Sequence, residues 1–178
     1  MSKRCAARVK HIPGILLCTQ IWNMKSEYKD AVVEIWTEPA TMNTGAPEPV
    51  LLLEEHRLWV AYRAYDPDFP GYTDPAAADY LAAHPGEPFA VLSFEGVTEC
   101  RFGGPSDERL HEHPLYGRGL EFYQFHRVRC PSERTTLWIV TFHDETLEVR
   151  ARTATAIAMQ FVSDREEAIR LARSRSKT

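Results

Sequence analysis

Apolar residues occur along this chain in short alternating runs, and this pattern predicts many short β-strands. The runs are rich in β-branched and aromatic residues, and glycine, proline or polar clusters separate them. Glu55–Arg57 lies between two such runs and predicts a hairpin turn, and Gly96 interrupts another pair. The segments that we expect to form strands are 15–22, 31–37, 50–54, 58–65, 89–94, 97–102, 120–130, and two strands within 137–152.

Two short helices are expected beside these strands. Asp74 is a predicted N-cap for a helix over 75–83, which has proline at its first position. A second helix is predicted over 163–173, where Ser163 and Glu166 have the spacing of a capping box. Because strand signals outnumber helix signals, the predicted fold class is α+β: a mainly antiparallel β-sheet, curved or barrel-like, with one or two short helices.

The segment 137–152 predicts a hairpin with two chemically different faces. If Asp144 and Glu145 form the turn, one face carries only apolar residues: Trp138, Val140, Phe142, Leu147, Val149 and Ala151. Asp-Glu is not a preferred two-residue turn, and a four-residue loop over 143–146 would keep the same register. The other face carries His143, Thr141 and Glu148. This second face is either open surface or the lining of a pocket, and the sequence leaves both alternatives open.

The length and composition predict one folded domain. The chain has 178 residues, of which 44% are hydrophobic and 26% charged, enough for a core without disulfide or metal support. We place the α+β domain at 13–173, between a basic N-terminal tail at 1–12 and a frayed C-terminus at 174–178.

Charge is distributed unevenly along the chain, whose net value is -4. Residues 1–12 hold four basic and no acidic side chains, whereas the middle of the chain is strongly acidic. An acidic body does not suit contact with a phosphate backbone, so we do not expect nucleic acid to be a partner. The basic ends are the solvated tails that many domains have.

Apolar runs are too short to cross a bilayer, so no membrane association is expected. The N-terminal run 15–18 is also too short for the apolar part of a signal peptide. The four cysteines are widely spaced without a C-x-x-C pair, which favours reduced thiols over a disulfide framework. These features predict a cytoplasmic protein.

A set of ionisable residues on two predicted strands carries the candidate chemistry. His143, Glu148 and Glu121 are the candidate catalytic residues, because acid–base catalysis uses paired carboxylates and imidazole. The candidate ligand-binding residues around them are Thr141, Asp144, Glu145, Tyr123 and Arg127. The same set is also typical of an exposed sheet face, so it does not by itself indicate an enzyme.

His111 and His113 form the densest pair of potential metal ligands. Imidazoles two residues apart on a strand can share a metal, as in the H-x-H pattern of cupins. Here Pro114 interrupts such a strand, and the next carboxylate, Glu121, is too distant for that pattern. We therefore expect no cofactor and prefer a metal-free protein. His126 falls on an apolar face and is expected to be a core residue.

Two stretches resemble a group of uncharacterised bacterial proteins. The first, "FGGPSDERLHEHPLYGRGLEFYQFHRV", carries a G-P-x-D-E…H-P-L…G-L block, and the second, "FHDETLEV", carries an F-H-D-x-T-x-E block. The resemblance covers roughly residues 90 to 152. It implies no activity and no catalytic residues.

The sequence favours a protein that binds a small molecule or a protein partner through a curved antiparallel sheet. One alternative is a small acid–base or metal-dependent enzyme that uses His143, Glu148 and Glu121. Another is an accessory or immunity-type protein that acts through its surface. Standard nucleotide, hydrolase and metalloprotease motifs are absent from the sequence.

Overall fold

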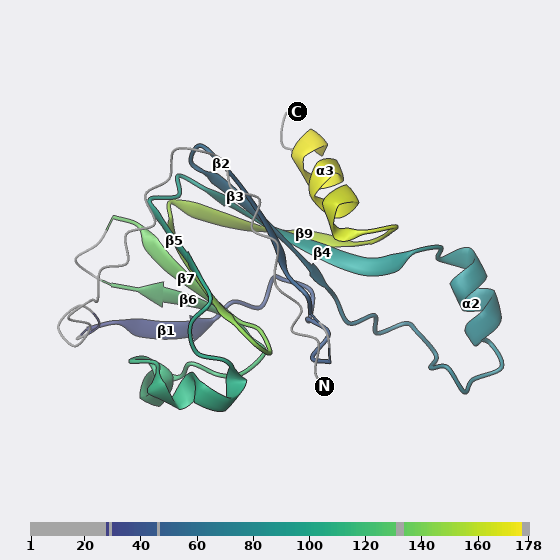
Figure 1. Ribbon diagram of the computed structural model, residues 1–178, viewed down its shortest axis with the longest axis horizontal. Helices are drawn as coiled ribbons and strands as arrows, with labels where there is room; N and C mark the ends of the chain where they lie inside the picture. Colours follow the sequence, from purple (N-terminus) through teal and green to yellow (C-terminus); the bar gives the residue numbers. More distant parts are fainter. Residues whose placement is uncertain (1–27, 29, 46, 131–133, 176–178) are drawn as a thin grey trace, which may run out of the picture.

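Two antiparallel β-sheets pack face to face in the computed structural model, which describes residues 28, 30–45, 47–130 and 134–175 (Figure 1). One sheet has five strands in the order β1–β6–β7–β8–β5, and the other has four in the order β2–β3–β4–β9. The strands are β1 (Val32–Ile35), β2 (Val50–Glu54), β3 (Arg57–Arg63), β4 (Glu87–Glu95), β5 (Glu99–Phe102), β6 (Phe125–Arg129), β7 (Thr136–Thr141), β8 (Thr146–Ala151) and β9 (Thr153–Val162). The helices are α2 (Ala77–Ala83), α3 (Arg165–Arg175) and the 3₁₀-helices η1 (Asp107–Glu112) and η2 (Tyr116–Arg118).

The predicted fold class is confirmed. The strand pairs within both sheets of the described residues are antiparallel, and the helices are short. The sheets remain separate layers and do not close into a barrel. Within the described residues, no helix combines the length and the apolar character that crossing a bilayer requires.

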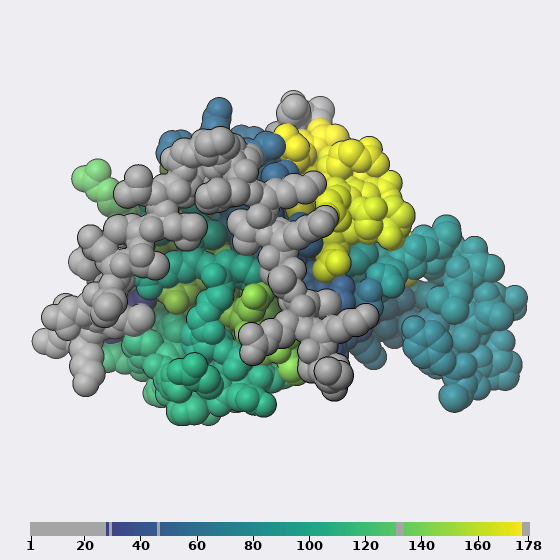
Figure 2. All heavy atoms as spheres, viewed as in Figure 1, coloured from purple at the N-terminus to yellow at the C-terminus, as the bar shows by residue number. Residues whose placement is uncertain are grey.

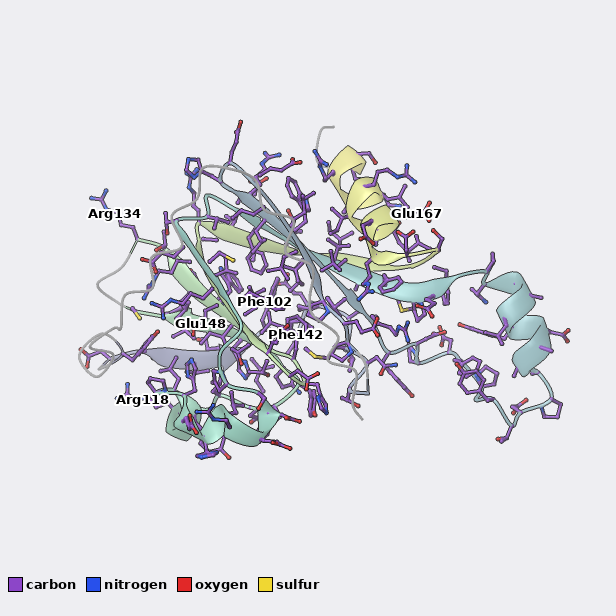
Figure 3. The ribbon with its side chains drawn as sticks, in the orientation of Figure 1. Phe102, Arg118, Arg134, Phe142, Glu148 and Glu167 are labelled. Carbon is purple, nitrogen blue, oxygen red and sulfur yellow. The ribbon has the colours of Figure 1, made fainter. Side chains whose placement is uncertain are left out.

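The core between the sheets follows from alternation along each strand. Every second residue of β3, β4, β7 and β8 points into this core, including Tyr62, Phe94 and Trp138. Phe142, the residue after β7, points into it as well. The ring of Phe142 also meets that of Phe102 from β5 edge to face, with centroids 6.5 Å apart (Figure 3). Burying a large apolar side chain contributes roughly 1.5–3 kcal/mol, so this layer is the main source of stability.

The chain passes between the two sheets at one corner. The β4–β5 connection turns at Gly96, which has a φ of +65°, and the β8–β9 connection passes through Arg152. The two crossings are adjacent, because the N–H of Arg152 donates to the carbonyl of Glu95 at 2.9 Å. A Cβ on Gly96 would lie 3.0 Å from the Cβ of Arg152, so glycine suits both the conformation and the close approach.

Helix α3 covers the outer face of the four-stranded sheet. Ala168, Ile169 and Ala172 pack against apolar side chains of β3 and β4, including Trp59. The predicted capping box was wrong by one residue. Asp164 accepts the N–H of Glu167 at 2.7 Å, and the Glu167 carboxylate bonds back to Ser163. The cap residue is Asp164 rather than Ser163, because the Asp164 side-chain oxygen accepts the N–H of the residue three positions later.

Residues 103–120 cover the outer face of the five-stranded sheet. The hydrophobic pattern predicted neither a strand nor a helix over 103–119, so this layer was not expected. Its 3₁₀-helices bury Leu110, and the neighbouring turns bury Leu115 and Leu120 against β6 and β7. Isolated leucines five residues apart produce no helical stripe or strand alternation, which is why the pattern did not show this layer.

Several element boundaries differ from the prediction. Strand β9 was not predicted, because "TATAIAMQFV" is rich in alanine; its pairing with β4 makes it a strand. Strand β6 begins at Phe125 rather than residue 120. Helix α2 begins at Ala77, since Asp74 bonds to the N–H of Ala76 in a turn before the helix. The strand predicted at 15–22 lies outside the described residues.

Candidate functional site

The β7–β8 hairpin keeps the predicted division of its faces but shifts the predicted pairing by two residues. Val140, rather than Phe142, lies opposite Leu147. A two-residue shift returns every side chain to its predicted face, so the six apolar residues all lie in the core. The loop contains the four residues 142–145 and is closed by the Phe142 N–H, which donates to the Glu145 carbonyl at 2.9 Å. The prediction of a two-residue turn at Asp144 and Glu145 was therefore wrong. Asp-Glu is not a pair that two-residue hairpin turns prefer.

The second face of the hairpin is covered along its strands and open to solvent at the loop, where His143 lies. Along the strands it lies beneath residues 103–120, so polar side chains there are buried: Thr141 is 2% exposed and Arg150 6%. Arg150 forms an ion pair with Glu99 of the adjacent strand, with Nε 3.2 Å from the carboxylate oxygen. Buried polar groups need such partners, because desolvation without compensation costs several kcal/mol.

Four polar side chains meet where the hairpin loop touches the start of η1, and we call them the hairpin-tip cluster: Asp107, Tyr123, His143 and Asp144. The Tyr123 hydroxyl donates to Oδ2 of Asp107 at 2.6 Å. Nε2 of His143 lies 3.7 Å from the same Asp107 oxygen, and its Nδ1 lies 2.9 Å from Oδ1 of Asp144. The His143 side chain is 47% exposed and that of Asp144 87%, so the cluster is open to solvent.

Backbone and side-chain bonds from three segments hold this cluster in place. The Asp107 N–H donates to the His143 carbonyl at 2.9 Å, which ties η1 to the hairpin loop. Oγ1 of Thr141 accepts the Gln124 N–H at 3.0 Å and donates to the Glu121 carbonyl at 2.8 Å. Thr141 thereby fixes the turn in which Tyr123 has a φ of +54°, a conformation that a bulky residue rarely adopts.

The electrostatics of the cluster favour a charged imidazole. The hydrogen bond to Asp144 raises the pKa of His143, and the nearby charge of Asp107 acts in the same direction. The hydrogen bond from Tyr123 lowers the pKa of Asp107 and raises the pKa of Tyr123 to about 12. Burial raises the pKa of Glu145 in the same loop. The imidazole of His143 therefore lies between two carboxylates, both of which favour its charged form.

Two buried histidines lie under the 103–120 layer, each with its tautomer set by a backbone amide. Nδ1 of His113 accepts the Leu115 N–H at 3.1 Å, so the proton of the neutral ring is on Nε2. Nε2 of His126 accepts the Glu121 N–H at 3.0 Å, so its proton is on Nδ1. Burial lowers the pKa of His126 to about 4, which keeps this ring neutral at physiological pH.

The remaining nitrogens of these two rings, Nε2 of His113 and Nδ1 of His126, make no hydrogen bond within the part of the chain that the structure describes. Nε2 of His113 lies 3.6 Å from Oε1 of Glu148, beyond direct hydrogen-bond distance. A metal on Nε2 of His113 would require a proton on Nδ1, and Nδ1 already accepts an amide N–H. The His111 side chain is exposed on η1 and that of His113 is buried, so the two imidazoles do not point to the same place. No group of three or more His, Cys, Asp or Glu side chains among the described residues could hold a metal ion.

The predicted site residues separate into different places. His143, Asp144 and Tyr123 come together in the hairpin-tip cluster, and Thr141 and Glu145 lie beneath or beside it. Glu148 lies deeper in the sheet near His113, and no direct contact joins it to His143 among the described interactions. Arg127 pairs with Glu34 of β1 at 2.9 Å. Glu121 contributes backbone groups to its neighbours.

Asp107 is the functional candidate that the sequence analysis missed. It receives the Tyr123 hydroxyl and faces His143, yet it lies far from both in the sequence. Its position in the G-P-S-D-E stretch was noted, but no periodicity or spacing predicted its contacts. Only the folding of residues 103–120 over the sheet brings it to the hairpin.

The enclosed space near the site is very small. A cavity of about 10 Å³ lies between charged side chains of β5 and β8, and its lining residues are Tyr28, Glu99, Arg101, Leu137, Glu148 and Arg150. This volume is that of roughly one water molecule. A comparison of the chain with protein-family models, with curated proteins and with solved structures finds no match.

Proposed function

We propose that this protein is a binding protein that contacts a protein partner through its surface. The observation that carries the proposal is that both faces of the two sheets are covered in the described residues. The inner faces pack on each other, α3 covers one outer face, and residues 103–120 cover the other. A small-molecule pocket usually measures 300–1,000 Å³. The enclosed cavity of about 10 Å³ is far below that size, and the hollow of about 540 Å³ beside Phe122 is an open groove, which suits contact with a protein surface.

The proposed contact surface is the hairpin-tip cluster with the two aromatic side chains near it. Tyr116 and Phe122 are each about 40% exposed and meet edge to face, with ring centroids 6.1 Å apart. They line a shallow open groove with Glu121, and Phe122 is next along the chain to Tyr123. Exposed aromatic residues beside hydrogen-bonding side chains are the combination that protein interfaces favour.

A site-specific photocrosslink tests this proposal. The photoreactive phenylalanine analogue benzoylphenylalanine replaces Phe122, and the full chain is irradiated in lysate of its source cells. Partners identified by mass spectrometry are then purified, and their Kd is measured directly. His143→Gln should abolish the crosslink and weaken binding about tenfold. His111→Gln, an exposed histidine in the same region, is the matched control and should change neither. Equal effects of the two variants would overturn the proposal.

Acid–base catalysis at His143 is the second candidate. It is favoured by the raised pKa of His143 and by the Tyr123 hydroxyl, which holds the Asp107 carboxylate beside the ring. A metabolite mixture followed by NMR provides the test. Turnover of a component by the native protein, lost in His143→Gln at an unchanged melting temperature, would replace partner binding with an enzymatic function.

The site of action that we propose is the cytoplasm of a bacterium. Cys100 is a thiol without a disulfide, and its burial raises its pKa to about 11. An unreactive reduced thiol suits a reducing compartment. The bacterial source rests only on the resemblance of the two sequence stretches described above.

A further inference from the structure

Residues 64–86 leave the sandwich between β3 and β4 and form a projection that ends in α2, which we call the arm. Figures 1 and 2 show it extending beyond the packed body. Its root is fixed, because the Tyr65 N–H donates to the Thr41 carbonyl and the Ala64 N–H to that of Pro88. Within the arm only Ala64 and Ala77 are buried. The arm therefore contributes little to the core of its own domain.

A stack of rings gives the arm a defined shape. The Phe69 ring lies 4.8 Å from that of Tyr72 and 5.7 Å from that of Tyr80, measured between centroids. Tyr80 stacks on His84 at 4.2 Å, and His84 meets Phe161 of β9 at 4.8 Å. The stack runs from the arm to the four-stranded sheet, so the arm presents its outer face in a fixed orientation.

The outer face of the arm is apolar and uncovered. In α2, Ala78, Leu81 and Ala82 have the spacing of one helical face, and all three are exposed. Leu81 is 46% exposed, and Tyr72 on the preceding loop is 86% exposed. A seven-residue helix is too short to be stable in isolation. An exposed apolar stripe on such a helix is typical of a surface that a partner covers.

The arm also carries the excess charge of the chain. Asp66, Asp68, Asp74 and Asp79 lie in it, and it contains no lysine or arginine. Of the 25 acidic residues these four are in the arm, and the other 21 balance the 21 lysines and arginines elsewhere. A partner surface that complements the arm is therefore positively charged, and the arm repels the phosphate backbone of a nucleic acid. A second copy of the chain carries a basic segment at residues 1–12 but no net charge outside its arm as a whole, so self-association is an outcome that the experiment below separates.

We propose that the arm docks a separate protein whose basic residues surround an apolar pocket. Leu81 and Tyr72 enter the pocket, and Asp68, Asp74 and Asp79 pair with lysine or arginine at its rim. This inference rests on the proposed partner-binding function and assigns to it a second surface, on different elements from the hairpin-tip cluster. The central apolar contact gives affinity, and the rim charges give orientation and salt dependence.

Zero-length coupling with a carbodiimide tests the charge contacts, because it joins a carboxylate only to an amine in contact with it. The full chain is coupled in lysate of its source cells, and the joined peptides are identified by mass spectrometry. We expect Asp68, Asp74 or Asp79 to be joined to lysines of one protein. That protein is then purified, and its Kd is measured by calorimetry at low and high salt.

Two variants and a matched control complete the design. The triple variant D68N/D74N/D79N removes three charges, and asparagine can still accept the Ala76 N–H that Asp74 accepts. It should weaken binding roughly tenfold or more and flatten the salt dependence. Leu81→Gln should weaken binding at all salt concentrations. The control E38Q/E55Q/E166Q removes three exposed carboxylates elsewhere and should leave the Kd unchanged.

The outcomes separate failure of the arm from failure of the proposed function. A partner that crosslinks at Phe122 but binds the triple variant and the control equally overturns the arm proposal alone. Joined peptides between isotopically light and heavy copies of this chain would overturn it in favour of self-association. If neither coupling nor photocrosslinking joins any protein to the chain, both proposals fail.

Discussion

Nε2 of His113 lies 3.6 Å from Oε1 of Glu148, and this pair brings residues 103–120 next to strand β8 of the hairpin. The Thr146 hydroxyl donates to the Pro105 carbonyl at 2.8 Å, a second contact between the same segments. Together with Asp107 and His143, these contacts place residues 103–120 over the hairpin. These residues therefore have a physical role in building this layer.

Phe142 should be essential for stability, whereas Phe122 should not. Phe142 is fully enclosed between the sheets, and Phe122 is 41% exposed. Phe142→Ala is expected to lower the free energy of unfolding by about 3–5 kcal/mol, because it leaves a cavity in the core. Phe122→Ala should change it by less than about 1 kcal/mol. Urea denaturation measures both, and equal losses would contradict the assignment of Phe142 to the core.

Thr141 is predicted to stabilise the turn before β6 through its hydroxyl. Thr141→Val keeps the shape but leaves the Gln124 N–H and the Glu121 carbonyl without this partner. The expected loss is about 1–3 kcal/mol. Thr153→Val, at an exposed position of β9, is the matched control and should be within about 0.5 kcal/mol of the native protein. A loss no greater at Thr141 than at Thr153 would show that the hydroxyl does not hold the turn.

His126 should make stability fall in mild acid. Its pKa is about 4 in the folded protein against 6.5 in the unfolded chain, so the unfolded state takes up its proton first. The stabilisation is complete above pH 6.5 and is lost as the pH falls from 6.5 towards 4, by at most about 3 kcal/mol. Unfolding free energies from urea titrations at several pH values measure this slope. The slope should flatten in His126→Gln and remain in His111→Gln; an unchanged slope in both would refute the role of His126.

The pKa of His143 should respond to its two carboxylate neighbours unequally. The hydrogen bond that the His143 ring donates to Asp144 is the largest cause of the raised pKa, and Asp107 acts through its charge. Asp144→Asn should therefore lower the pKa of His143 more than Asp107→Asn does, as followed by NMR titration of the imidazole. Because the pKa of His143 is raised in the folded protein, its charged ring adds to the free energy of unfolding in acid. This contribution is lost as the pH rises through that pKa. A larger effect of Asp107→Asn would reverse the assignment of the two carboxylates.

The sequence by itself determined the strands of the hairpins, the inner face of each sheet and the fold class. The two-residue period decides which side chains share a face, and it survives even the two-residue error in the β7–β8 register. Trp138 and Phe142 were therefore assigned to the apolar face of their hairpin from alternation alone. The burial of His126 followed from the same argument, because it alternates with Val128.

Only the tertiary structure decided what covers each sheet and which polar residues meet. Residues 103–120 have no periodicity, so their burial of Leu110 and His113 depends on contacts with distant strands. The pairing of Asp107 with Tyr123 and His143 is likewise long-range and leaves no local signal. Local sequence governs which side of a strand is apolar, and the three-dimensional packing of distant segments governs which side chains become neighbours.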